Sequence, residues 1–181
     1  ASELSSPVIV ETSEGEMAFD GPRVMVAAFQ ALQREINIPT VLHLDHGKNF
    51  ETIKTAISAG YTSVHVDASI LPYSENLALT KSVVALAHPL NIFVEGELGH
   101  VPGTSEAPEL KIREVVSNIV KTDPTQAVKF VKETGIDCLA ASYGNLHGLY
   151  QDEKKLDCDL IKTLREAVDC FLSLHGSSGI K

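Results

Sequence analysis

Residues 41–47 read VLHLDHG, an apolar strand pattern that runs without a break into an acid, an imidazole and a glycine. By the period-two rule of strands, Val41, His43 and Asp45 fall on one face, and the two leucines fall on the other. The strand therefore delivers a carboxylate and a histidine to its C-terminal end. Two later stretches, 140–148 and 171–176, also place a His-Gly pair after an apolar run.

Short apolar runs alternate with helical patterns along the whole chain. The runs predict strands that start near residues 8, 40, 63, 93, 138 and 171. Apolar residues at three- and four-residue spacing predict helices over residues 22–35, 50–58, 72–88, 124–134 and 157–168. Between residues 100 and 121 we expect a mobile loop with a helical piece around 111–120. The alternation is the repeat of βαβ units, so it predicts a parallel sheet.

The positions of the polar residues indicate the fold class. Because glycines and histidines come directly after strands, the functional end of the sheet is the C-terminal one, as in a TIM (β/α)8 barrel. Six strands are too few to close a barrel, so we expect about six of its βα units, with residues 1–181 forming a single, partial TIM-barrel domain. An open, doubly wound sheet is the alternative, but no G-x-G-x-x-G turn marks a dinucleotide site.

The composition is that of a globular protein with an acidic surface. At 181 residues and 44% hydrophobic content, the chain can bury a core and is most simply one domain. Its 15 basic and 24 acidic residues give a net charge of −9, which argues against nucleic acid and anionic membranes as partners. An anionic ligand would have to be held by a local feature, such as a metal ion or a glycine-rich turn.

The cysteines and the apolar runs indicate the cellular compartment in which the protein is expected. Cys138, Cys158 and Cys170 are odd in number and form no C-x-x-C pair, which argues against a disulfide framework and a thiolate zinc site. No apolar run reaches the roughly 18–20 residues of a membrane span, and the first residues lack the features of a signal peptide. We therefore expect a cytoplasmic protein.

Three histidines, His46, His147 and His175, stand at three strand ends that a barrel would bring together. Three neutral imidazoles, with a fourth position open to a substrate oxygen, are the donor set of a catalytic zinc site. Each of them alone could be an ordinary polar histidine at the end of a strand. Their repetition as His-Gly pairs favours zinc.

Three carboxylates also stand at strand ends. Asp45 adjoins a proposed ligand and is interpreted as a general base or acid; the alternative is a carboxylate that orients an imidazole. Asp67 and Glu97 end the next two strands, where they could hold a second cation or help to position the first. A charge network at the end of the barrel is the alternative for both.

The remaining polar residues near strand ends have more modest interpretations. His43 and His65 are expected in the core or hydrogen-bonded inside the barrel, and His88 is expected to be structural. The Gly-Ser-Ser-Gly turn at residues 176–179 has the small residues and free N–H groups of a phosphate cradle, as does Gly148.

With these features the chain resembles the class II (zinc-dependent) fructose/tagatose-bisphosphate aldolase family. Sequence words along essentially the whole chain carry the resemblance: TSEG at 12–15, LHLDHG at 42–47, VDAS at 66–69 with LPYSEN at 71–76, EGELG at 95–99, GNLHG at 144–148 and LHGSSG at 174–179. Several such words in this order are highly specific.

The resemblance implies a TIM-barrel catalytic domain that reversibly cleaves a ketose 1,6-bisphosphate, most simply fructose 1,6-bisphosphate. The products would be dihydroxyacetone phosphate and glyceraldehyde 3-phosphate. It implies zinc held by His46, His147 and His175, and Asp45 as the base that serves the C4 hydroxyl. Four residues match positions that contact substrate or phosphate: Ser13, Gly148, Gly176 and Ser178.

The resemblance extends to further residues and also has departures. Asp67 and Glu97 match positions associated with a second metal, divalent or monovalent, or with an alternative zinc position. Glu106 matches, in an altered loop, the glutamate that exchanges a proton of dihydroxyacetone phosphate. Gln151 stands where the family has a lysine near a phosphate. The family's first strand, and its eighth strand with an Asn-x-Asp word, lie outside residues 1–181.

Three alternatives stay open beside the leading interpretation. They are a tagatose 1,6-bisphosphate aldolase, a truncated relative that binds metal without turnover, and a zinc hydrolase in which the same residues activate water. For the leading interpretation, the expected partners are a phosphorylated sugar and further copies of the chain in a homodimer or homotetramer.

Overall fold

The computed structural model describes residues 1–103, 119–147, 156–177 and 180. Within these residues, six parallel strands form one sheet in which spatial order equals sequence order. The strands are β1 (Val8–Ser13), β2 (Thr40–Gly47), β3 (Ser63–Val66), β4 (Phe93–Leu98), β5 (Cys138–Ala141) and β6 (Phe171–Ser173). All six start at or near the predicted residues.

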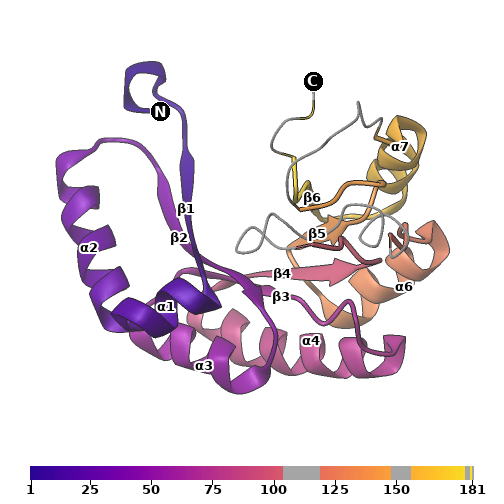
Figure 1. Cartoon of the computed structure of the whole chain (residues 1–181), viewed down its shortest axis with the longest axis horizontal. Helices are drawn as coiled ribbons and strands as arrows, with labels where there is room; N and C mark the ends of the chain where they lie inside the picture. The colour runs from indigo at the N-terminus through magenta and orange to yellow at the C-terminus, as the bar shows by residue number, and fades with distance from the viewer. Residues whose placement is uncertain (104–118, 148–155, 178–179, 181) are drawn as a thin grey trace.

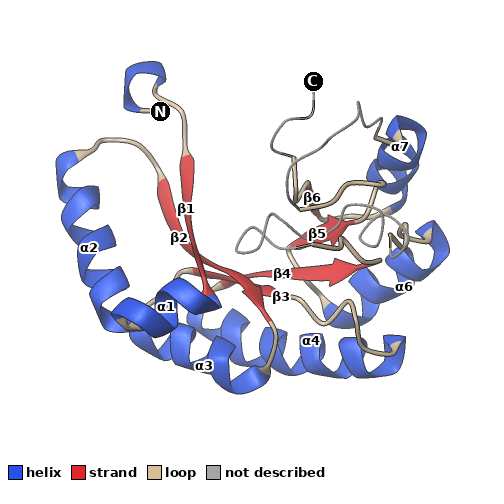
Figure 2. Ribbon diagram, viewed as in Figure 1, coloured by secondary structure: helices blue, strands red, loops and turns tan. Residues whose placement is uncertain are grey.

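Helices connect successive strands and cover the outer side of the curved sheet (Figures 1 and 2). They are α1 (Glu14–Asp20), α2 (Pro22–Glu35), α3 (Phe50–Ala59), α4 (Tyr73–Ala87), α6 (Pro124–Thr134) and α7 (Cys158–Ala167), with short 3₁₀ turns at Ser2–Leu4 and His88–Leu90. A doubly wound sheet would reverse its strand order partway, and this one does not. The prediction of a partial (β/α)8 barrel is therefore confirmed, and the doubly wound alternative is wrong.

Helix α1 was not among the helices predicted from the sequence. Strand β1 continues to Ser13, whose side chain accepts from the backbone N–H of Glu16, while the Glu16 carboxylate accepts from the backbone N–H of Ser13. This reciprocal capping box starts a helix directly at the strand end. The helical piece expected around residues 111–120 lies mostly outside the described residues; Val120 itself pairs with His100 in an isolated bridge.

The hydrophobic core lies between the sheet and the helices. Leu42 and Leu44, on one face of β2, are at most 1% exposed and belong to the same buried cluster as helical residues such as Ile53 and Phe130. Burying a side chain of this size contributes about 1.5–3 kcal/mol. The other face of the sheet looks into a cavity of about 830 Å³ lined, among others, by Val41, His43 and Asp45. In β2, strand alternation therefore places the two leucines in the core and His43 and Asp45 beside the cavity, as expected.

Among the described helices, none is both long and apolar enough to cross a membrane.

Candidate metal centre

A β-bulge at the end of β2 determines where the side chains of Asp45 and His46 point. The register with β3 breaks between Leu44 and Gly47, and His46 has a left-handed backbone with a φ of 49°. A bulge lets consecutive side chains point to the same side of a sheet, which strict alternation forbids. Asp45 and His46 accordingly line the same 360 Å³ pocket at the C-terminal end of the strands.

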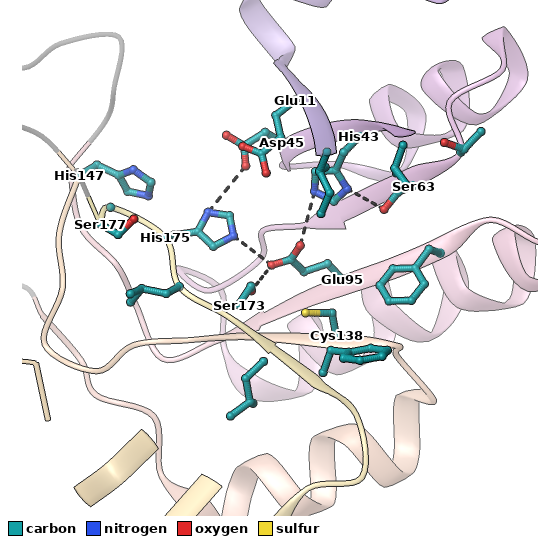
Figure 3. A pocket seen from close by; sticks show the side chains of 18 residues that line it. Glu11, His43, Asp45, Ser63, Glu95, Cys138, His147, Ser173, His175 and Ser177 are labelled. Carbon is teal, nitrogen blue, oxygen red and sulfur yellow. Dashed lines mark hydrogen bonds and ion pairs between the residues drawn. The ribbon is translucent and has the colours of Figure 1, made fainter. Parts of the chain in front are cut away.

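The three histidines predicted to bind zinc come together at this end of the sheet. The ring centroid of His46 lies 4.8 Å from those of both His147 and His175, which are 6.0 Å from each other. They come from the end of β2, the loop after β5 and the loop after β6. Figure 3 shows His147 and His175 turned towards the same space, with Asp45 beside them.

The loops that carry His147 and His175 are fastened to each other. Asn145 Nδ2 donates to the carbonyl of His175 at 2.7 Å, and Asn145 Oδ1 accepts from a backbone N–H of its own loop at 2.7 Å. Gly176 has a φ of 60° and lies so close to the carbonyl of Leu146 that an added Cβ would overlap it. Gly176 therefore allows the two loops to approach.

Two carboxylates orient two of the rings. Asp67 Oδ2 lies 2.8 Å from His46 Nδ1, and Glu95 Oε1 lies 3.0 Å from His175 Nε2. Because an ionised carboxylate only accepts hydrogen bonds, each of these ring nitrogens carries a proton. In the neutral rings, the opposite nitrogens, Nε2 of His46 and Nδ1 of His175, then carry lone pairs that a cation can use.

The free ring nitrogens have the chemistry of zinc ligands. His46 and His175, with Asp45 and His65, offer ligand atoms that lie within 4.8 Å of one another. Nε2 of His46 and Nδ1 of His175 face each other at 3.2 Å, and two lone pairs at this distance repel unless they share a proton or a metal ion. Within the described part of the chain, the buried Nε2 of His147 has no hydrogen-bond partner. Burial lowers the pKa of His147 to about 4, and so does the charge that His46 and His175 carry when they are protonated. The His147 imidazole is therefore neutral at pH 7, the form that binds metal.

Asp67 and Glu97 lie on the far side of His46 from these donors. Burial opposes ionisation of Asp67, but the hydrogen bond with His46 and the charges of His65 and His46 together outweigh it and lower the pKa of the carboxyl. Glu97 Oε2 lies 3.7 Å from His46 Nδ1 and, among the described residues, has no hydrogen-bond partner although it is buried. The three residues offer ligand atoms within 4.8 Å of one another. Their role as a second metal site stays a prediction.

Asp45 lies among the imidazoles. Its Oδ1 is 3.7 Å from ring nitrogens of His46, His65 and His175 and has no hydrogen-bond partner within the described ranges. Burial opposes ionisation, but the neighbouring imidazoles outweigh it and lower the pKa of Asp45 to about 2. The carboxylate is therefore ionised at neutral pH, as a general base must be.

The other histidines agree with their modest interpretations. His65 is fully buried, and its Nδ1 accepts from the backbone N–H of His46 at 3.2 Å, so it supports the bulge. His43 Nδ1 lies 2.7 Å from a serine hydroxyl, and burial lowers the pKa of His43 to about 4. His88 lies outside this cluster and pairs with Asp137 at 3.0 Å.

The structure describes two of the residues predicted to contact substrate. Ser13 lines the 360 Å³ pocket beside the histidines, although its hydroxyl also caps α1. Gly176 lines the 830 Å³ cavity. The substrate roles of both residues stay predictions. The other candidates lie outside the described residues: Glu106, Gly148 and Ser178.

Two residues of the site were not assigned a role from the sequence. Glu95 is buried below His175, and Asn145 ties the loop of His147 to that of His175. Both stand in the sequence words that carry the family resemblance. The signal for Glu95 was its spacing from Glu97, because residues two apart in a strand face the same side.

Comparisons with known proteins identify the family of the chain. The family model described as "Fructose-bisphosphate aldolase class-II" matches residues 1–181. The chain is 41% identical to the fructose-bisphosphate aldolase of Geobacillus stearothermophilus and 39% identical to a probable fructose-bisphosphate aldolase of Bacillus subtilis, in each case over 99% of the chain. It spans 62% of the length of each of these relatives.

Solved structures give the same picture. The YdjI aldolase of Escherichia coli K12 superposes with a TM-score of 0.83 at 36% identity, covering 100% of this chain and 61% of that one. A putative fructose-1,6-bisphosphate aldolase of Coccidioides immitis superposes with a TM-score of 0.86 at 31% identity, covering 98% of this chain and 62% of that one. With a family match over its whole length, the chain belongs to the class II fructose-bisphosphate aldolase family.

Proposed function

We propose that the protein is a zinc-dependent aldolase that reversibly cleaves fructose 1,6-bisphosphate to dihydroxyacetone phosphate and glyceraldehyde 3-phosphate. The observation that carries the proposal is the convergence of His46, His147 and His175 beside the ionised carboxylate of Asp45. Family membership supports this class of reaction. The names of the two curated relatives favour fructose over tagatose as the sugar.

The mechanism assigns one task to each group. His46, His147 and His175 would hold the zinc ion, which when bound supplies a Lewis acid for the negative charge developing on the C2 oxygen. Asp45 accepts the proton of the C4 hydroxyl as the C3–C4 bond breaks, so that C4 leaves as the aldehyde of glyceraldehyde 3-phosphate. The electron pair of that bond stays on the three-carbon fragment. Glu106 delivers a proton to its C3 and completes dihydroxyacetone phosphate.

The substrate's two phosphates must be held against a net charge of −9. Glycine-rich turns do this with backbone N–H groups, which carry partial positive charge without a cationic side chain. We assign this task to the turns that contain Gly148 and to Gly176 and Ser178, with Ser13 as a further contact. We also assign the protein to the cytoplasm, as a homodimer or homotetramer.

The test is cleavage of fructose and tagatose 1,6-bisphosphate by the purified chain, with and without a chelator, and with zinc content measured on the same sample. We expect chelator-sensitive cleavage at about one zinc per chain. Release of inorganic phosphate without an aldehyde product would instead indicate a zinc hydrolase. Bound zinc without turnover of either sugar would contradict the proposal and favour the non-catalytic alternative.

Replacement of the proposed base tests the mechanism separately from metal binding. Asp45→Asn keeps the shape of the side chain but cannot accept the C4 proton, so kcat should fall about 10²–10⁴-fold. Zinc content should stay that of the unaltered chain, because the three histidines remain. The matched control is Asp137→Asn, which replaces a carboxylate bonded to His88 and the backbone of β4, outside the histidine cluster. Full activity in Asp45→Asn would remove Asp45 from the mechanism.

A further inference from the structure

We propose that Glu95 is a positioning residue of the metal centre, which holds the His175 ring so that its Nδ1 faces the zinc ion. The inference rests on the proposed function, because the ion is the one assigned there. It adds a buried carboxylate that lies between His175 and His43 (Figure 3).

The Glu95 carboxylate contacts polar side chains from more than one strand. Its Oε1 lies 3.0 Å from His175 Nε2 and also accepts from the hydroxyl of Ser173. Its Oε2 lies 3.5 Å from His43 Nε2, and the other nitrogen of that ring lies 2.7 Å from Ser63 Oγ. The carboxylate is thus fixed by groups from β2 and β6, and its residue is only 7% exposed.

The period of β4 explains why two glutamates serve different histidines. Glu95 and Glu97 are two residues apart in the strand, so both point to the inner face at successive levels. Glu97 Oε2 lies near His46 and His65, at 3.7 and 3.5 Å. Glu95, one level deeper, lies under His175.

An imidazole can turn either of its two nitrogens towards a metal, by rotation of the ring and by exchange of tautomer. A carboxylate on one nitrogen fixes both choices and makes the other nitrogen a better donor. Asp67 does this for His46 through Nδ1, and Glu95 does it for His175 through Nε2. The two carboxylates therefore hold opposite nitrogens, and the two remaining nitrogens face each other at 3.2 Å.

The test compares zinc affinity, measured by competition with a chromophoric chelator, among the unaltered chain, Glu95→Ala and Glu95→Gln. Glu95→Ala leaves His175 Nε2 without its acceptor, so the zinc dissociation constant should rise about 10–100-fold. Glu95→Gln keeps an acceptor oxygen of the same reach and should recover most of that loss. The visible spectrum of bound cobalt(II) should change in Glu95→Ala and be largely restored in Glu95→Gln.

Asp137→Ala is the matched control. Asp137 accepts from the backbone N–H of Val94 at 2.8 Å, so its loss weakens the same strand without touching the centre. If Glu95→Ala binds zinc no more weakly than Asp137→Ala, or if Glu95→Gln is as impaired as Glu95→Ala, the positioning role is overturned. Because affinity is measured without substrate, an unaltered chain that binds zinc but cleaves no sugar would overturn the proposed function alone.

Discussion

Cys138 and Cys170 lie where a thiolate is costly, whereas Cys158 is exposed. Burial, together with the charge of Glu95, raises the pKa of Cys138 to about 12, and burial raises the pKa of Cys170 to about 11. Only the thiolate attacks a disulfide reagent. At pH 8, a reagent such as dithionitrobenzoate should therefore modify one thiol per chain quickly and the other two only after unfolding.

Cys158→Ser is the control for this prediction, since it should abolish the fast phase while leaving the two slow thiols unchanged. Cys138 tests the prediction most strictly. It lines the 830 Å³ cavity, which a reagent could enter, but only 7% of the residue is exposed. A fast phase of two or more thiols in the folded chain would show that these side chains are more accessible than the structure indicates.

Sequence patterns indicate which side chains stand at strand ends more readily than which side chains meet inside the barrel. His46, His147 and His175 could be found because each follows an apolar run and precedes a glycine. Glu95 could not be assigned, because its partners Ser173 and His175 are 78 and 80 positions away and are known only once the register across three strands is known.

At the scale of elements, strands and long helices were predicted because hydrophobic periodicity repeats over several turns. Helix α1 spans only seven residues, with Met17 as its buried residue, so it offers no period to recognise. The bulge in β2 was missed for a related reason. Strict alternation would place Asp45 and His46 on opposite faces of the strand. They line one pocket because the register between β2 and β3 shifts before Gly47, and the hydrogen bond from His46 to His65 holds this bulge.

The bulge gives a prediction about Gly47, which ends β2. A Cβ added there would lie 2.7 Å from the backbone carbonyl of His65 and 2.6 Å from Ile53 Cγ1, so the backbone itself would have to move. Gly47→Ala should lower the free energy of unfolding by about 1–3 kcal/mol. Gly96→Ala is the matched strand control, because its Cβ would meet only side chains, at 3.2 Å or more.

Denaturant unfolding of both variants, followed by circular dichroism, gives the comparison. The expected order of stability is unaltered chain, Gly96→Ala, then Gly47→Ala. Equal losses in the two variants would mean that the end of β2 adapts to a side chain, and that the close approach to His65 does not restrict this position to glycine.

At the scale of the whole molecule, the candidate metal centre joins parts of the chain that sequence separates. His46 and His175 are 129 positions apart, and His147 comes from a third loop, so a shared ion would link β2 to the segments after β5 and β6. An ion that binds the folded chain and not the unfolded one stabilises it by about 2.7 kcal/mol at a hundredfold excess over its dissociation constant. For a chain of this size, the midpoint of thermal unfolding should rise by roughly 5–10 °C.

The measurement is thermal unfolding with zinc and with chelator, for the unaltered chain, His175→Ala and His88→Ala. His175→Ala removes the ligand nearest the C-terminal end and should lose most of the zinc-dependent rise. His88→Ala removes a histidine that pairs with Asp137 outside the centre, so it should keep the full rise even if it lowers the midpoint itself. A zinc-dependent rise of the same size in His175→Ala would mean that the ion does not connect β2 to the segment after β6.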